Sequence, residues 1–518
     1  MDRASSPPAP LCADPPGDAT RSAASRWLGA IDRHAAVAAL LLFLAHLAVK
    51  APAVGSRSLW LDEAWTAALA HRAVRDIVAA AAVDQNPPLY NVGMRAWVAL
   101  AGDSEAALRW PSIVASAATA SALFLLARRF AGIEAALYAS LLFAASEPEL
   151  YYAREARSYA VVGLLCTVSY FLFLANLARP AWRTALALGG VNAAAAWTHF
   201  TAILALVAQL ATAVVHARAR PRAVALYAAG QVLALALFAP WIGPLLANLP
   251  RAGAFWLAPP TLADAREVVG ELAGGEGALV AQIAVLAVAG AALLLAARGA
   301  RASSPPPSAV AAGDAPGTAR VAVVAFAAWA VVPIALAYAL SQRTPAFGTR
   351  YLLFSSLGWF LLVAAALARL PIHGALRAAA ALAIAILAAS QLDWHRTRNA
   401  DWRAAVAFAE PGPGTAIVVA PAWQCLPFAY YLDRASFPDE ARRARALAEA
   451  RVACATSPRD VAVADLARAT RVVVAFGKGV SPDFRSLFAA LERAGFARAP
   501  ARPFPGGNVV ELRRSGAP

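Results

Sequence analysis

Long apolar runs recur through most of this chain, and they restrict its fold more than any other feature. About eleven of them reach the roughly 17 to 25 residues that a helix needs to cross a bilayer. They lie near residues 35–54, 109–127, 131–150, 158–177, 184–199, 201–216, 223–247, 277–297, 321–340, 351–368 and 375–392. Because 60% of the 518 residues are hydrophobic and only 15% are charged, the sequence predicts a mainly helical protein that crosses a membrane many times.

Arginine is concentrated in alternate connections between these runs. The arginines of five such connections are Arg128 and Arg129; Arg179 and Arg183; Arg218, Arg220 and Arg222; Arg298, Arg301 and Arg320; and Arg369 and Arg377. Loops rich in Arg and Lys stay in the cytoplasm, so all five predict one orientation, with a cytoplasmic N-terminus. A span over Pro88–Gly102 would break this alternation, so we interpret that segment as an amphipathic helix in the outer interface.

The net charge of +15 is explained by these loops. No basic stripe or base-stacking aromatic module indicates a nucleic-acid partner. The bias toward Ala and Arg over Lys is typical of a bacterial genome rich in G and C, and we expect the inner membrane as the location.

The two ends of the chain differ from its apolar middle. Residues 1–33 are rich in Pro, Ala, Ser and Arg, which predicts a disordered cytoplasmic tail before a transmembrane domain at 34–392. The Pro- and Ser-rich stretch 302–319 predicts a flexible cytoplasmic linker. After Gln391, short apolar runs such as AIVV and VVVAF alternate with helical stretches. This pattern predicts a small extracytoplasmic α/β domain at 393–518 with a largely parallel sheet.

The four cysteines show no CxxC and no metal-ligand spacing. Cys425 and Cys454 both belong to the outer domain, in an oxidising compartment, so a disulfide between them is plausible, although spacing does not give their distance. Neither Cys12 nor Cys166 is expected to be reactive.

The segment LDEAW places two adjacent acids, Asp62 and Glu63, in the first outer loop between Trp60 and Trp65. One interpretation is that the acids only stabilise the start of a short helix. The other is catalytic. Adjacent residues on a helix point about 100 degrees apart, so only one acid of the pair could face a reacting atom.

Three further outer segments carry candidate residues. The two prolines of DQNPPLY would display Asp84, Gln85 and Asn86 at the start of the interfacial helix, although taken alone the segment favours an ordinary turn followed by a helix start. The second outer loop and two span mouths supply the remaining candidates, which are Arg154, Glu155, Arg157, Tyr159, His199, Arg350 and Tyr351. Charges at the edge of a membrane are costly and usually mark a site, and an arginine can offer a fork to a phosphate. Ion pairing within the loop and anchoring to lipid phosphate are the alternatives.

No nucleotide-binding, zinc-protease or serine-hydrolase motif is found. An outer carboxylate beside cations suits glycosyl transfer from a lipid-phosphate sugar, because phosphate leaves readily without a general acid. Asp62 or Glu63 would remove the proton of an acceptor hydroxyl, and Arg350 with Arg154 or Arg157 would stabilise the departing phosphate. Since nothing demands a second carboxylate as nucleophile, we favour inversion.

Together, LDEAW, NPPLY, EARSY and TRY resemble the motifs of the membrane-embedded GT-C glycosyltransferases. The likeness is to bacterial relatives of the protein O-mannosyltransferase family, glycosyltransferase family 39, which include the aminoarabinose transferases acting on lipid A. This resemblance implies a polyprenyl-phosphate sugar donor, an extracytoplasmic site, and inversion without an obligatory metal, while a divalent metal stays open. It implies that the first-loop acids carry the base and that acids near Glu155 mark the donor site. The family often has a histidine before the prolines, where this chain has DQNPPLY.

A transporter or flippase for lipid-linked sugars is the main alternative. Transporters tend to have repeated halves with broken helices and charges near the middle of the membrane. The informative charges here gather at one face, and no internal repeat is visible. The sequence therefore favours an enzyme whose acceptor is a lipid, a glycan or a protein.

Overall fold

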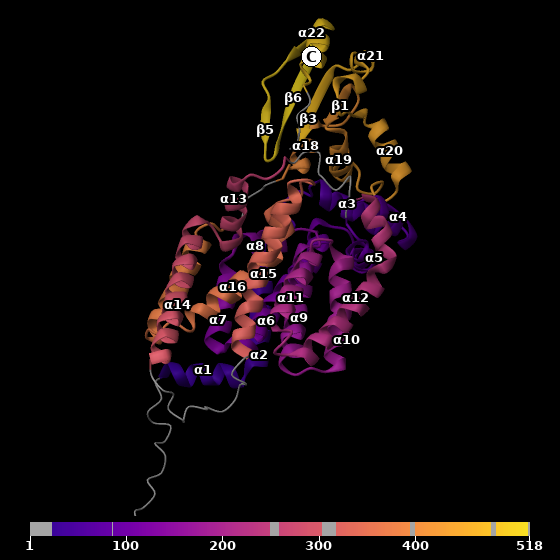
Figure 1. The fold of residues 1–518 in the computed structure, drawn as a ribbon. Coiled ribbons are helices and arrows are strands. Elements are labelled where there is room, and N and C mark those ends of the chain that lie inside the picture. Colours follow the sequence, from indigo (N-terminus) through magenta and orange to yellow (C-terminus); the bar gives the residue numbers. More distant parts are fainter. Residues whose placement is uncertain are drawn as a thin grey trace, which may run out of the picture.

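A computed structural model describes residues 23–84, 86–248, 258–302, 318–393, 399–477 and 483–515. These residues form a bundle of long helices with a smaller α/β domain at one end (Figure 1). The bundle holds seventeen helices, whose bounds are α1 Ala23–Arg33, α2 Ala35–Lys50, α3 Leu61–Ala70, α4 Val74–Val83, α5 Leu89–Ala101, α6 Glu105–Ala131, α7 Ile133–Ala145, α8 Glu147–Ala153, α9 Tyr159–Ala178, α10 Trp182–Thr198, α11 Ala202–His216, α12 Pro221–Asn248, α13 Leu262–Ala273, α14 Glu276–Ala302, α15 Thr318–Ser341, α16 Thr349–Leu367 and α17 Gly374–Ala389.

Each of the eleven predicted runs forms one of these helices. Six of the described helices, α6, α9, α12, α14, α15 and α16, are long and apolar enough to cross a membrane. A seventh is counted if α1 and α2, which meet at 85°, are taken as one span. Helices α7, α11 and α17 are shorter but apolar. The predicted linker at 302–319 lies almost wholly outside the described residues.

Small residues let the helices of the bundle approach closely. A Cβ atom built on Gly189 of α10 would lie 2.4 Å from the carbonyl oxygen of Gly230 of α12, so only glycine fits there. Aromatic rings fill the wider gaps, and the rings of Tyr170 and Trp329 stack at 4.0 Å. Lipid tails are as apolar as the side chains, so this dense packing stabilises the bundle where burial from water cannot.

The prediction of a disordered tail over all of residues 1–33 is wrong for its last third. Ala23–Arg33 form helix α1, in which Trp27, Leu28 and Ile31 share one side at helical spacing. Asp32 accepts a hydrogen bond from Arg128 Nε at 2.6 Å, which ties α1 to the end of α6. The average composition of residues 1–33 did not reveal this short apolar stripe, because Pro, Ala, Ser and Arg dominate the segment. Residues 1–22 are outside the described part of the chain.

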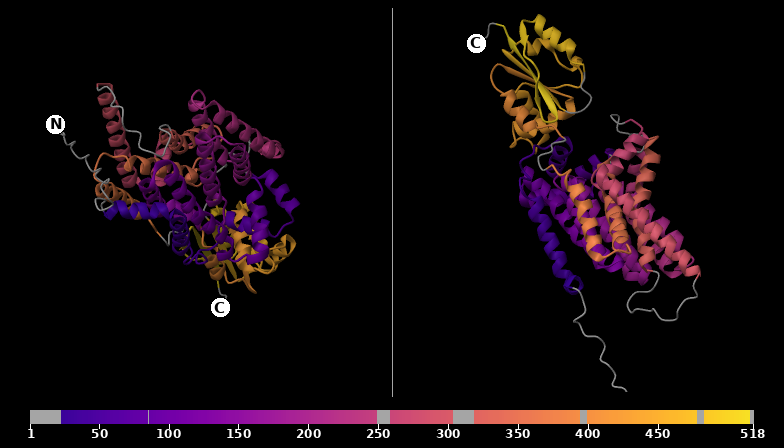
Figure 2. Two further views of the ribbon diagram at one scale, coloured as in Figure 1. Left: turned by 90° about the horizontal axis from the view of Figure 1, so that it is seen from below. Right: turned by 90° about the vertical axis from the view of Figure 1, so that its left-hand side faces the viewer.

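The short helices α3, α4, α5, α8 and α13 gather at the end of the bundle nearest the α/β domain, whereas α1 lies across the opposite end (Figure 1). Helix α5, the segment predicted to lie in the interface, has 13 residues and is not among the candidate spans. All segments that the arginine pattern assigns to the outer side therefore meet at one end. Figure 2 shows the α/β domain standing over the N-terminal helices of the bundle.

The α/β domain contains a six-stranded sheet in the order β2-β1-β3-β6-β4, with β5 paired to β6. Its elements are α18 Trp402–Ala409, β1 Thr415–Ala420, η3 Ala422–Gln424, α19 Cys425–Leu432, α20 Glu440–Glu449, β2 Val452–Cys454, η4 Pro458–Asp460, α21 Val463–Leu466, β3 Arg471–Gly477, α22 Arg485–Arg493, β4 Phe496–Arg498, β5 Arg502–Phe504 and β6 Gly507–Arg514. Along β1, Val418 packs into one apolar cluster and Ile417 into another, so both faces of the sheet are covered.

The prediction of a largely parallel sheet is only half right. Strands β1, β2 and β3 are parallel, but β6 is antiparallel to β3, β4 and β5. The tight turn between β5 and β6 accounts for the antiparallel pairing of these two strands, because Gly506 adopts a φ of +71° that reverses the chain within two residues. Such a turn joins antiparallel strands, whereas parallel strands need a longer crossover.

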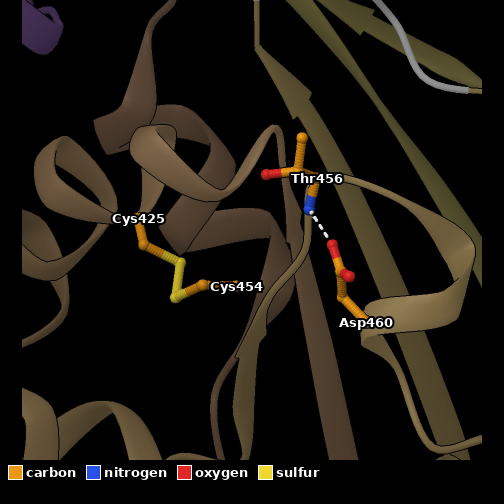
Figure 3. The surroundings of a disulfide bond; sticks show 4 residues. All are labelled: Cys425, Cys454, Thr456 and Asp460. Atoms are coloured by element: carbon orange, nitrogen blue, oxygen red, sulfur yellow. Dashed lines mark hydrogen bonds between the residues drawn. A yellow bond between two sulfur atoms is a disulfide. The ribbon is translucent and has the colours of Figure 1, made fainter.

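A disulfide joins Cys425, the first residue of α19, to Cys454 at the end of β2 (Figure 3). The Cα atoms are 5.9 Å apart. Beside it, the backbone N–H of Thr456 donates to Asp460 Oδ2 at 2.8 Å, which closes the next turn. The disulfide therefore links α19 covalently to β2, the strand at the edge of the sheet.

Replacing both cysteines by serine should lower the free energy of unfolding of this domain by about 3 to 4 kcal/mol, because the bond restricts a long loop in the unfolded chain. Pulse proteolysis of the detergent-solubilised protein in urea measures the change. The control is Cys12→Ser, which removes a cysteine outside this bond. An unchanged urea midpoint in the double variant would contradict the expectation.

Candidate active site

Asp62 and Glu63 start helix α3 and have different surroundings. The Glu63 side chain is buried, and its carboxylate accepts two hydrogen bonds from Arg109, Nε to Oε1 at 2.8 Å and Nη2 to Oε2 at 2.7 Å. The backbone N–H of Ala156 donates to Oε1 at 2.8 Å. Burial acts to raise the pKa of Glu63, but the charge and hydrogen bonds of Arg109 outweigh it and lower the pKa. Glu63 is thus an ionised carboxylate held inside the protein.

Arg109 was missed in the sequence analysis, although it stands at the outer start of an apolar run, where a charge calls for an explanation. Besides Glu63 it donates to the carbonyl oxygens of Val54 at 2.7 Å, Arg57 at 2.9 Å and Ser58 at 3.1 Å. These contacts shape the loop that leads into α3. The buried pair therefore holds together the first outer loop, the second outer loop and α6.

Asp62 faces two arginines from other elements. Its Oδ2 atom lies 3.8 Å from Arg157 Nη2 and 3.9 Å from Arg350 Nη1. Both distances are those of ion pairs but exceed that of a hydrogen bond, so the carboxylate is paired with the two cations by charge without a direct hydrogen bond to either. The Asp62 side chain is 29% exposed. Burial acts to lower the pKa of Arg157, but Asp62 and Tyr159, with a smaller effect from Tyr90, together outweigh it and raise the pKa.

Aromatic side chains hold the two guanidinium groups. Arg350 Nη2 donates to the Tyr351 hydroxyl at 2.8 Å, and its guanidinium lies 5.8 Å from the Trp60 ring centroid. Arg157 lies 5.9 Å from the Tyr159 ring centroid. A guanidinium that lies against an aromatic ring keeps its charge and its position. The group of Asp62, Arg157, Tyr159, Arg350 and Tyr351 is called the Asp62 cluster below.

His199 closes this cluster from the junction of α10 and α11. Its ring centroid is 5.8 Å from that of Tyr159 and 6.1 Å from that of Tyr351. The backbone N–H of Thr201 donates to His199 Nδ1 at 3.3 Å, and the Thr201 hydroxyl lies 2.8 Å from the same atom. Because an amide N–H can only donate, Nδ1 is an acceptor and the proton of the neutral ring is on Nε2. The buried Nε2 atom has no partner among the described residues.

Glu155 lies close to this cluster but has its own environment. It is 3% exposed; its Oε1 atom accepts a hydrogen bond from Asn399 at 3.3 Å, and Oε2 has no partner among the described residues. Burial, helped by the charge of Glu63, raises the pKa of Glu155 to about 7. Asn399, which comes from the segment before α18, was not among the predicted site residues.

The remaining predicted residues come from the second outer loop and from the connection between α4 and α5. Arg154 Nη2 donates to the carbonyl oxygen of Pro52 at 2.6 Å. Asp84 and Asn86 lie between α4 and α5, and Gln85 is outside the described residues. The described residues also contain no group of three or more His, Cys, Asp or Glu side chains that could hold a metal ion.

Comparison with known proteins identifies the fold. Residues 85–243 match the family model for dolichyl-phosphate-mannose-protein mannosyltransferase. The crystal structure of ArnT from Cupriavidus metallidurans bound to undecaprenyl phosphate matches with a TM-score of 0.55, covering 94% of this chain and 98% of that one at 13% identity.

The chain shares the GT-C fold of ArnT. The apo structure of the same protein has a TM-score of 0.41 at 14% identity, covering 95% of this chain and 98% of that one. No curated protein matches the sequence. The predicted fold class, a GT-C helical membrane bundle with a small C-terminal α/β domain, is thereby confirmed. The family match begins after LDEAW, so it includes Arg157 and His199 but neither Asp62 nor Arg350.

Proposed function

We propose that the protein is an integral-membrane glycosyltransferase that moves a sugar from a polyprenyl-phosphate donor to an acceptor hydroxyl outside the cytoplasm. The observation that carries this proposal is the Asp62 cluster, in which one carboxylate forms ion pairs with two cations without a direct hydrogen bond to either. Such a group of side chains can hold an anionic phosphate and a proton acceptor at the same time. The fold match to ArnT and the mannosyltransferase family model support the reaction class.

Arg157 and Arg350 would hold the phosphate of the donor, and His199 would add a neutral donor through Nε2–H. Charge develops on the phosphate oxygen as the sugar leaves, and fixed donors around that oxygen stabilise the transition state. The aromatic rings beside the arginines suit a partly apolar ligand. ArnT was crystallised with undecaprenyl phosphate, and we extend that class of lipid to the donor of this chain.

Asp62 rather than Glu63 would serve as the base. Once the arginines turn to the phosphate, Asp62 is free to accept the proton of the acceptor hydroxyl. The acceptor oxygen then forms a bond to the anomeric carbon, the bond from that carbon to the phosphate oxygen breaks, and its electron pair leaves with the phosphate. Attack from the side opposite the phosphate inverts the anomeric centre. Glu63 would be a structural partner of Arg109.

The arginine pattern supports an orientation in the bacterial inner membrane with the Asp62 cluster and the α/β domain outside the cytoplasm. Asp84, Gln85 and Asn86 would then be in place to position the acceptor, and Arg154 and Glu155 would border the donor site. A panel of polyprenyl-phosphate sugars, offered to the purified protein with mass detection of products, tests the proposal. No turnover with any donor and acceptor would favour the transporter.

Arg350→Gln should weaken the binding of undecaprenyl phosphate about tenfold to a hundredfold, because a charged hydrogen bond contributes about 1.5 to 3 kcal/mol. Isothermal titration calorimetry in detergent measures the affinity. Arg343→Gln is the matched control, since Arg343 is exposed near the same end of the bundle. Equal affinity in both variants would remove Arg350 from the donor site.

A further inference from the structure

The α/β domain forms several hydrogen bonds with the loop at residues 55–60, which leads into α3. Arg403 of α18 donates from Nη1 to the carbonyl oxygen of Ser56 at 3.1 Å and from Nη2 to that of Gly55 at 3.2 Å. Its backbone N–H donates to Ser58 Oγ at 3.3 Å. Three bonds from one residue therefore fix the middle of a loop that has little secondary structure of its own.

Tyr431 of α19 holds the end of the same loop. Its hydroxyl oxygen accepts a hydrogen bond from the backbone N–H of Leu59 at 2.7 Å and donates to Glu105 Oε1 at 3.2 Å. Leu59 is fully buried, so its N–H has no access to water if this bond is lost. The hydroxyl thus connects Leu59, which is three residues before Asp62, to Glu105 at the start of α6.

Helix α19 is itself well fixed. Ala429, Tyr430 and Phe437 share an apolar cluster with Leu59 and Ala67. The disulfide at Cys425 anchors the start of the helix to the sheet. Tyr431 is therefore a rigid point from which a loop can be positioned.

We infer that Tyr431 is a positioning residue through which the α/β domain aims Asp62 at the reacting sugar. The inference rests on the proposed function, because it takes Asp62 as the base. Removing the hydroxyl leaves the buried Leu59 N–H unpaired and lets the loop move, and a displacement of about 1 Å in a reacting group can cost up to a hundredfold in rate. Arg157 and Arg350 lie on other elements and contact this segment only at Trp60 and Asp62 among the contacts described above, so loss of the Tyr431 hydroxyl should affect binding of the donor less than kcat.

The test is Tyr431→Phe, which keeps the ring and removes only the hydroxyl. We expect amide hydrogen exchange at Leu59 to become about tenfold faster and kcat to fall about tenfold, with a smaller change in the KM for the donor. Tyr430→Phe is the matched control. It removes a hydroxyl in the same interface that donates to the carbonyl oxygen of Asp103 at 2.9 Å rather than bonding to Leu59.

The control should retain both the exchange rate and kcat of the wild-type protein. Three results would each overturn the inference: exchange at Leu59 that is unchanged in Tyr431→Phe, faster exchange with an unchanged kcat, or identical losses in the two variants. Exchange is measured without substrate. A wild-type protein that transfers no sugar would therefore refute the proposed function, while the exchange rates would still report whether Tyr431 holds the loop.

Discussion

Asp62→Asn is expected to lower kcat for sugar transfer by about a hundredfold to ten-thousandfold, the range that a positioned base contributes. Asparagine has nearly the same shape as aspartate but cannot take up the proton of the acceptor. Because the neutral side chain also removes the charge beside Arg157 and Arg350, binding of undecaprenyl phosphate should be unchanged or tighter. Steady-state kinetics with mass detection and a binding titration measure the two effects.

Asp76→Asn is a suitable control, since Asp76 is a partly exposed acid in the next helix of the same loop. It should behave as the wild-type protein. Full transfer activity in Asp62→Asn would show that this carboxylate is not the base. Loss of donor binding together with activity would indicate a structural role instead.

Glu63→Gln is expected to destabilise the protein by about 3 to 5 kcal/mol, because it leaves the buried Arg109 charge without its partner. The guanidinium and carboxylate are 2% and 1% exposed, so water cannot replace the lost contact. Thermal unfolding in detergent, followed by circular dichroism, measures the change. Substitution of the two adjacent acids should therefore have different effects: Asp62→Asn should lower kcat, whereas Glu63→Gln should lower the stability of the fold.

The double variant Glu63→Leu with Arg109→Met tests whether the loss of stability in Glu63→Gln comes from the unpaired charge of Arg109, because the double variant removes both charges. Replacing both members of a buried pair by apolar residues is often neutral or stabilising, so the double variant should be more stable than Glu63→Gln. If Glu63→Gln unfolded like the wild-type protein, the pair would not be the structural element that its geometry indicates.

Much of the site could be found from the sequence because its residues come from segments that membrane topology forces to one side. Asp62, Arg157, His199 and Arg350 are far apart in the chain, yet each stands in or beside a segment that the arginine pattern assigns to the outer side. The sequence could not show which acid of the pair faces these cations. That choice depends on Arg109, whose side chain enters the first outer loop from 46 residues away.

The contacts between the helical bundle and the α/β domain could not be predicted from the sequence either. Tyr431 is separated from Leu59 by 372 residues, and no local pattern in α19 distinguishes it from the neighbouring Tyr430. Asn399 reaches Glu155 across 244 residues. Such pairs follow from how the α/β domain docks, and hydrophobic periodicity carries no information about docking.

The sequence by itself determined that this is a helical membrane protein with several apolar helices, and that its charged motifs share one end. These properties follow from apolar length and charge bias, which act on each segment separately. Only the tertiary structure decided that Glu63 is buried against Arg109, that Asp62 faces Arg157 and Arg350, and that β6 runs antiparallel. Each of these depends on distances between side chains that are remote in the chain, and such distances exist only once the helices and the sheet have packed.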